Sequence, residues 1–207
     1  YGMVEVARRL QKEKVQYLGV ACVDEGIVLR KAGIRTPILV LSSVLPYEAA
    51  YALYYDLTLT VCDKELAAAI DKAARKLKKH AVVHVKVDTG MGRLGVWHDE
   101  AGRLIKDLLG FKNIIIEGIF THFASADEED VRYTVRQIEN FKRLVAEMEI
   151  NGIEIKYVHA ANSAGAMLYK DSHFNMVRPG LMLYGLYPNR VLENVVKLKP
   201  ALSLKTR

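Results

Sequence analysis

The regular alternation of helical and extended segments constrains the fold of this chain most. Apolar residues recur at helical spacing in some segments, and short runs rich in β-branched residues lie between them. Because strands that alternate with helices pair in parallel through right-handed crossovers, the pattern predicts an α/β protein built on a parallel sheet. About seven strands are expected, at residues 17–23, 37–41, 57–62, 81–88, 114–122, 155–159 and 175–178.

Two architectures satisfy this alternation, an open doubly wound sheet and a closed (β/α)8 TIM-type barrel. An open sheet concentrates its ligand-binding loops at one switch point, whereas a barrel gathers them at the carboxyl ends of many strands. Polar and glycine-rich segments follow several of the expected strands, at residues 86–93, 121–122, 159–163 and 178–180. We therefore expect a (β/α)8 barrel, and the helix before the first strand indicates that this sequence lacks the barrel's first strand.

Composition limits the kinds of partner. The 207 residues are 51% hydrophobic and 26% charged, which is typical of a globular protein with its own core. No apolar run approaches the roughly 18 residues that span a bilayer, and no signal-peptide pattern opens the sequence, so we expect a cytoplasmic protein without a membrane partner. The net charge of +6 comes from scattered Lys and Arg, so nucleic acid is not an expected partner. The cysteines have neither a CxxC pair nor histidines at metal spacing, so no metal site is expected.

The strand at residues 81–88 leads into the first candidate site. Valine at alternate positions predicts one face packed on helices, and His84, Lys86 and Asp88 then lie on the opposite face. The glycine-rich turn that follows lets the backbone approach a ligand closely, and Arg93 is the fixed cation in that turn. A tight loop with a solvated arginine is the alternative interpretation.

Two later loops suggest a phosphate site. Asn162 and Ser163 stand where a helix is expected to begin, so backbone N–H groups and the Ser163 hydroxyl can face an anion. Gly180 lets its own N–H group and that of Leu181 approach the same point. An ordinary helix cap accounts for Asn162 and Ser163 equally well, so the loops alone do not decide between the two interpretations.

Taken together, these segments resemble the motifs of the bacterial alanine racemase family, in the family's order. The matching segments are residues 86–95, 118–124, 159–163 and 177–181 with 183–185, and Tyr1-Gly2 resembles the end of the family's cofactor-lysine motif. The resemblance implies a fold-type III enzyme that uses pyridoxal 5'-phosphate, with an amino-terminal barrel and a carboxyl-terminal β domain. It implies a homodimer with its sites at the subunit interface. Residues 1–188 would form the barrel, and residues 189–207 would cross into a β domain that this sequence does not contain.

The resemblance also implies a role for each matching residue around the cofactor. Tyr1 and Ser163, with Asn162 and the backbone at Gly180 and Leu181, would hold the cofactor phosphate. This placement agrees with the phosphate site inferred from the loops.

The remaining matches would surround the cofactor ring and the substrate. Arg178 would meet the pyridine nitrogen, and His122 would bond to Arg178 and link it to a catalytic tyrosine of the other subunit. Arg93 would lie beside the phenolic oxygen of the cofactor and the substrate carboxylate, and His159 would sit beside the ring. A structural role at the strand ends is the alternative for His122 and His159.

Lys86 is a candidate for carbamylation. If Lys86 and Arg93 converge in a partly buried site, repulsion lowers the lysine pKa and leaves a neutral amine to which carbon dioxide can add. Some members of the resembled family carry this modification.

The function implied is interconversion of L- and D-alanine by a two-base mechanism, which supplies D-alanine for cell-wall peptidoglycan. The family's Schiff-base lysine and tyrosine base are both missing from residues 1–207, so this chain alone is expected to be inactive. Three alternatives remain open: a racemase of another amino acid, a decarboxylase of basic amino acids, or a barrel that carries pyridoxal phosphate without catalysis.

Overall fold

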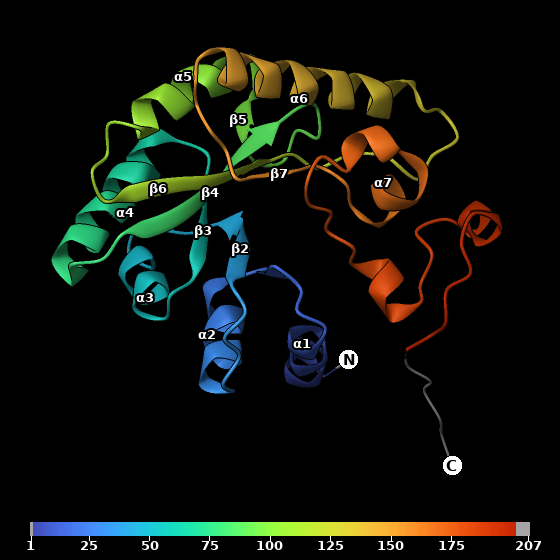
Figure 1. Ribbon diagram of the computed structural model, residues 1–207, viewed down its shortest axis with the longest axis horizontal. Helices are drawn as coiled ribbons and strands as arrows, with labels where there is room; N and C mark the ends of the chain where they lie inside the picture. The colour runs from blue at the N-terminus through green and yellow to red at the C-terminus, as the bar shows by residue number, and fades with distance from the viewer. Residues whose placement is uncertain (1, 202–207) are drawn as a thin grey trace.

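Parallel strands form a curved sheet, and helices lie around its outside (Figure 1). The computed structural model describes residues 2–201. The main path of the sheet runs in the order β1-β2-β3-β4-β6-β7, and the short β5 pairs with β4. The strands are β1 (Leu18–Val20), β2 (Ile38–Ser43), β3 (Thr58–Val61), β4 (Ala81–Asp88), β5 (Val96–Trp97), β6 (Ile114–Phe120) and β7 (Tyr157–His159).

Helices alternate with the strands along most of the chain, and one helix precedes the first strand. The helices are α1 (Met3–Lys12), α2 (Val23–Lys31), α3 (Ala49–Tyr54), α4 (Lys64–Leu77), α5 (His98–Leu108), α6 (Arg132–Ile150) and α7 (Ser163–Leu168). The start of α4 shows how the sequence sets these boundaries, because the Asp63 side chain accepts a hydrogen bond of 2.7 Å from the Leu66 N–H. Lys78 caps the other end of this helix and adopts the left-handed conformation, with φ of 54°.

The hydrophobic core lies between the sheet and the helices. Val83, Val85 and Val87 of β4 are fully buried and belong to one cluster with Ile70 of α4 and Ile105 of α5. The predicted valine face is therefore confirmed. Complete burial of one such side chain contributes roughly 1.5–3 kcal/mol, which makes the central strand a rigid support for the polar residues on its other face.

The parallel α/β class is confirmed, and the sheet of residues 2–201 has the form of a parallel half-barrel with β1 and β7 as its outer strands. The prediction of a strand at residues 175–178 is wrong, because this segment makes only an isolated bridge between Met176 and His159. The Asn175 side chain explains the difference. It accepts from Val158 N at 2.8 Å and donates to Lys156 O at 2.9 Å, so a side chain forms the bonds that a neighbouring strand would form with the backbone of β7.

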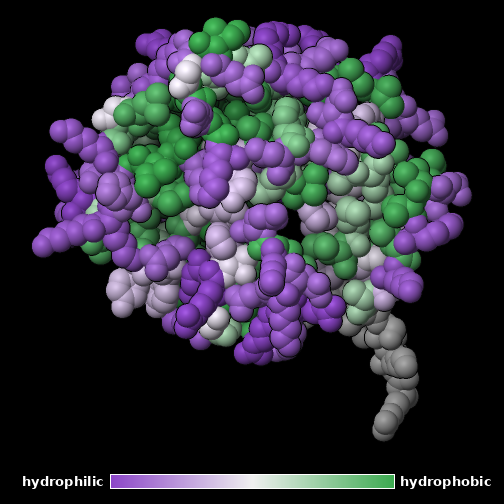
Figure 2. Space-filling model, in the orientation of Figure 1, coloured by the Kyte–Doolittle hydropathy of each residue, from purple (hydrophilic) through white to green (hydrophobic). Residues whose placement is uncertain are grey.

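The surface is mixed in polarity. On the face shown in Figure 2, hydrophobic patches interrupt a largely hydrophilic surface. Across residues 2–201, no helix is both long enough and apolar enough to cross a membrane.

Candidate functional site

The candidate residues gather at the carboxyl ends of β4, β6 and β7. These strands are neighbours, and their register aligns Lys86 with Phe120 and Phe120 with His159. His122 is the second residue after β6, and Ser163 begins α7 a few residues beyond β7. Because parallel strands all end at the same edge of a sheet, segments far apart in sequence meet there.

Arg178 lies at the centre of this edge. Its Nη2 donates to the backbone carbonyls of Thr121, at 2.6 Å, and Ala160, at 3.0 Å, while its Nη1 lies 2.8 Å from His159 Nδ1. The backbone N–H of Arg178 donates to Ala161 O at 2.8 Å, which fixes the position of the backbone as well. Burial lowers the pKa of Arg178 to about 9, so the guanidinium stays charged at neutral pH.

Both expected histidines contact this guanidinium. His122 Nδ1 lies 3.4 Å from Arg178 Nη2, whereas the contact of His159 Nδ1 with Nη1 is the shorter, at 2.8 Å. The expected pairing of His122 with Arg178 is present, but His159 is the closer partner. His159 also stacks on the Phe120 ring, with centroids 4.8 Å apart.

Both histidines are neutral. Burial, followed by the charge of Arg178, lowers the pKa of His122 to about 4 and that of His159 well below its ordinary value. A neutral imidazole can accept a hydrogen bond from arginine, which an imidazolium cannot. The site therefore combines one permanent cation with two uncharged rings.

The two loops predicted to form a phosphate site do converge. Asn162 caps α7, and its Oδ1 accepts from Gly165 N at 2.9 Å. The Ser163 hydroxyl oxygen accepts from Gly180 N at 3.0 Å and from Met182 N at 3.3 Å, which joins α7 to the loop after Arg178. A Cβ added at Gly180 would meet no atom within 4 Å, so open space lies in front of this backbone. Two other residues expected at this site are Leu181, which begins a 3₁₀ helix (Leu181–Tyr184), and Tyr1, which lies outside the described residues.

The loop after β4 is held by its own carboxylate. Asp88 accepts from Gly90 N at 2.8 Å and from Gly92 N at 2.9 Å, and both glycines have positive φ. Arg93 lies on the exposed side of this loop. Its charge is near enough to lower the pKa of both Lys86 and His122.

Lys86 is buried, with 4% of its surface exposed. Its Nζ donates to Val87 O at 3.2 Å and lies 5.4 Å from the centre of the Phe120 ring. Burial, and next the charge of Arg178, lowers the pKa of Lys86 to about 8. The expected repulsion therefore involves Arg178 more than Arg93.

Several polar residues of the site carry no motif signal. Gln137 of α6 is 1% exposed, and its side chain binds Ala124 N at 3.0 Å and His122 O at 3.2 Å, which fixes the segment that carries His122. Glu117 of β6 lies close to His84 and belongs to no motif either. The signal that could have found Glu117 is a charged residue inside the otherwise apolar run 114–120. Among residues 2–201, no group of three His, Cys, Asp or Glu residues could hold a metal ion.

Comparisons with known proteins agree with this arrangement. Residues 1–188 match the family model described as "Alanine racemase, N-terminal domain". The alanine racemase of Carboxydothermus hydrogenoformans is 47% identical, over 100% of this chain and 56% of that protein. The alanine racemase of Halothermothrix orenii is 44% identical, over 100% of this chain and 55% of that protein.

Solved structures show the same relationship. An alanine racemase of Clostridium difficile 630 superposes with a TM-score of 0.94 and 42% identity, over 97% of this chain and 56% of that one. The alanine racemase of Bacillus anthracis with bound L-Ala-P gives a TM-score of 0.82 and 36% identity, over 90% of this chain and 49% of that one. The chain thus spans about half the length of the relatives that it matches. With this identity along its whole length and a family model that covers residues 1–188, the chain belongs to the alanine racemase family and corresponds to its N-terminal domain.

Proposed function

We propose that this chain is the cofactor-binding part of a pyridoxal-phosphate-dependent alanine racemase that interconverts L- and D-alanine. The observation that carries the proposal is the Arg178 guanidinium, a permanent donor held by two carbonyls and two neutral histidines at the sheet edge. In the whole protein, we propose that residues 1–188 belong to a closed (β/α)8 barrel and that residues 189–207 lead into a second, β domain. The whole protein would be a cytoplasmic homodimer.

The residues at the sheet edge suit both the phosphate and the pyridine nitrogen of the cofactor. Ser163 with the backbone of Gly180 and Leu181 would hold the phosphate, with Asn162 fixing the start of α7 and Tyr1 assisting. The open space in front of Gly180 supports this placement, because a backbone without a Cβ can approach a phosphate closely. Arg178 would face the pyridine nitrogen.

The arginine at this position would determine how the protein interacts with the ring nitrogen of the cofactor. When bound, pyridoxal phosphate withdraws electron density from the α-carbon of an amino acid, so that the α-proton is lost more readily. Arg178 keeps its own proton at neutral pH and can therefore only donate a hydrogen bond to the ring nitrogen. Arg93 would hold the substrate carboxylate, because a guanidinium binds two anionic oxygens at once.

Racemisation needs a proton carrier on each face of the substrate. A lysine that would precede Tyr1 in the same polypeptide and a tyrosine of the partner subunit would supply the two carriers. His122 would help to orient the tyrosine, since its neutral ring lies beside Arg178.

The test is racemisation by the full-length protein loaded with pyridoxal phosphate, followed from L- and from D-alanine by chiral chromatography. We expect equal amounts of the two isomers at equilibrium. The Arg178→Glu variant should lose about a hundredfold or more in kcat, the range seen when one preorganised donor is removed. Arg143→Gln is the matched control, because Arg143 lies exposed on α6 and bonds only to Asn140 among the described residues. No racemisation by the loaded protein would reject the proposed function, and an Arg178→Glu variant with normal kcat would remove Arg178 from the site.

A further inference from the structure

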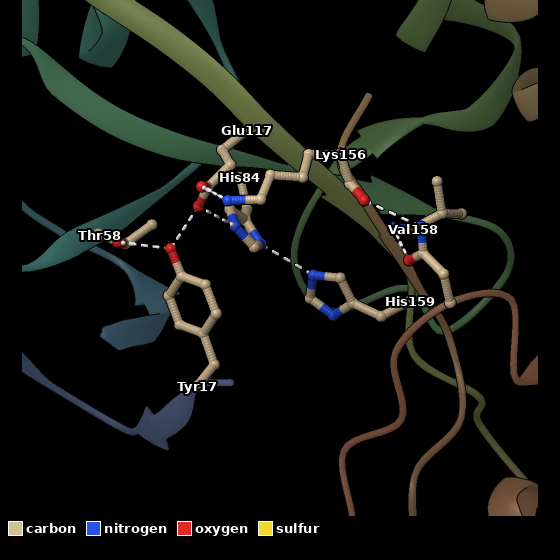
Figure 3. Close-up of polar contacts among 8 residues, drawn as sticks. Tyr17, Thr58, His84, Glu117, Lys156, Val158 and His159 are labelled. Carbon is tan, nitrogen blue, oxygen red and sulfur yellow. Dashed lines mark hydrogen bonds and ion pairs between the residues drawn. The ribbon is translucent and has the colours of Figure 1, made fainter. Parts of the chain in front are cut away.

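A line of four polar side chains crosses the interior of the sheet from Arg178 to Glu117. Arg178 Nη1 lies 2.8 Å from His159 Nδ1, and His159 Nε2 lies 2.8 Å from His84 Nδ1. His84 Nε2 then lies 3.7 Å from Glu117 Oε2. Figure 3 shows the two imidazole rings and the Glu117 carboxylate in this sequence, with His84 between its partners. Both histidines are fully buried.

The chemistry of arginine fixes the direction of every bond in this line. Arginine has only donors, so His159 Nδ1 must accept and carries no proton. The single proton of the neutral His159 ring is then on Nε2, where it is donated to His84 Nδ1. His84 therefore carries its own proton on Nε2, the nitrogen that faces Glu117.

A proton on Nδ1 of either ring would disrupt this arrangement of donors and acceptors. A proton on His159 Nδ1 would place two donors against each other at Arg178. A proton on His84 Nδ1 would force His159 Nε2 to accept, and His159 would then need its proton on Nδ1, against Arg178 again. One arrangement alone satisfies all the contacts while Arg178 is charged.

At the other end of this line, two hydrogen bonds hold the Glu117 carboxylate in place. The Tyr17 hydroxyl donates to Glu117 Oε2 at 2.5 Å, and Lys156 Nζ donates to Oε1 at 2.9 Å. His84 Nε2 is buried and has no hydrogen-bond partner within the described residues, and the Glu117 carboxylate is the anion that it faces. The Tyr17 and His84 rings also form an edge-type contact, with centroids 5.3 Å apart, so Tyr17 contacts both members of the last pair.

Gly118 leaves the room that the line requires. It pairs with His84 in the register of β6 and β4, and a Cβ at this position would lie 2.7 Å from His84 Nδ1. Nδ1 is the atom that accepts from His159. The glycine therefore leaves room for the His84 ring beside the neighbouring strand, at the position where Nδ1 accepts from His159.

We propose that His84 and Glu117 are positioning residues for Arg178, because the anion at one end and the guanidinium at the other select the same proton order in the two histidines between them. His159 then always presents a lone pair to Arg178, which holds the guanidinium in one orientation. The use of that orientation for a cofactor rests on the proposed function, whereas the proton order does not.

The experiment is nitrogen NMR of the full-length protein labelled with 15N-histidine and 15N-arginine, recorded at neutral pH. We expect His84 and His159 both to show a protonated Nε2 and an unprotonated Nδ1. His173 is an internal reference, because its Nε2 lies 2.9 Å from the Ala166 carbonyl, which can only accept. A proton on His159 Nδ1, or a doubly protonated ring at either position, would overturn the proposal from the wild-type spectrum alone, even if no variant folds.

A pair of variants tests the role of the anion. Glu117→Gln removes the charge that His84 Nε2 faces but leaves the constraint from Arg178, so Nε2 should stay protonated while its frequency changes, and the signals of His159 and of the Arg178 guanidinium should shift with it. Lys156→Gln removes the exposed partner of the same carboxylate but keeps the anion, and should leave these signals in place. If Glu117→Gln folds and moves these signals no more than Lys156→Gln does, Glu117 does not position Arg178. A protein with the expected proton order that fails to racemise alanine would instead reject the proposed function.

Discussion

At the residue scale, Lys86 combines burial with an amine that is reactive near neutral pH. Because burial and the charge of Arg178 lower its pKa to about 8, about a tenth of Lys86 is neutral at pH 7, far more than for an exposed lysine. We expect the neutral amine to add carbon dioxide and release a proton, which gives a carbamate anion that attracts Arg93 and Arg178. The neutral fraction, and with it the labelling by 13C-bicarbonate in NMR spectra, should increase as the pH rises from 6 to 8.

The control for this prediction is Lys64, an exposed lysine on α4 whose Nζ pairs with Asp107 at 3.2 Å. It should stay unlabelled under the same conditions, and Lys86→Arg should remove the signal of the wild-type protein. A wild-type protein that shows no carbamate signal across this pH range would mean that Lys86 acts as an ordinary buried cation.

At the scale of single elements, two glycines should respond differently to replacement by alanine, one in β6 and one in α5. A Cβ at Gly118 of β6 would lie 2.7 Å from the buried His84 ring, which cannot move away without losing its contact with His159. We expect Gly118→Ala to lower the free energy of unfolding by about 1–3 kcal/mol, the usual cost of overpacking. Urea unfolding followed by circular dichroism measures this change.

Gly102 of α5 is the matched control. Its added Cβ would meet the end of the Glu147 side chain, at 2.6 Å from Oε1, and that carboxylate is flexible and half-exposed. Alanine is preferred over glycine in a helix by up to about 1 kcal/mol, so Gly102→Ala should leave stability unchanged or raise it. Equal losses in the two variants would show that the His84 ring does not restrict the backbone at Gly118.

At the scale of the whole molecule, a polypeptide of residues 1–207 separates cofactor binding from catalysis. The convergence of Ser163 with the loop at Gly180 should let this polypeptide bind pyridoxal phosphate weakly and reversibly. It should not racemise alanine, since the two expected proton carriers lie outside it. After treatment with borohydride, intact-mass measurement should find no stoichiometric cofactor adduct, whereas the full-length protein should show one. A stoichiometric adduct on residues 1–207 would mean that a lysine of this chain binds the cofactor covalently.

The sequence by itself determined the local structure. The valine alternation in β4 separated the face that packs on the helices from the polar face, and the Asp63 cap set the start of α4, because side-chain period and capping depend on residues that are near in sequence. The family motifs also indicated which residues would meet at the sheet edge, including Ser163 with Gly180 and His122 with Arg178.

Only the tertiary structure decided the contacts between strands. His84 and His159 are 75 residues apart, and they meet because the register of β4, β6 and β7 brings their rings together. That register also brings Glu117 close to His84 and makes His159 the nearer partner of Arg178. The segment 175–178 has a strand-like sequence but makes one bridge, since the Asn175 side chain takes the backbone groups beside β7. Such contacts depend on the three-dimensional alignment of distant segments, which the period of any single segment does not specify.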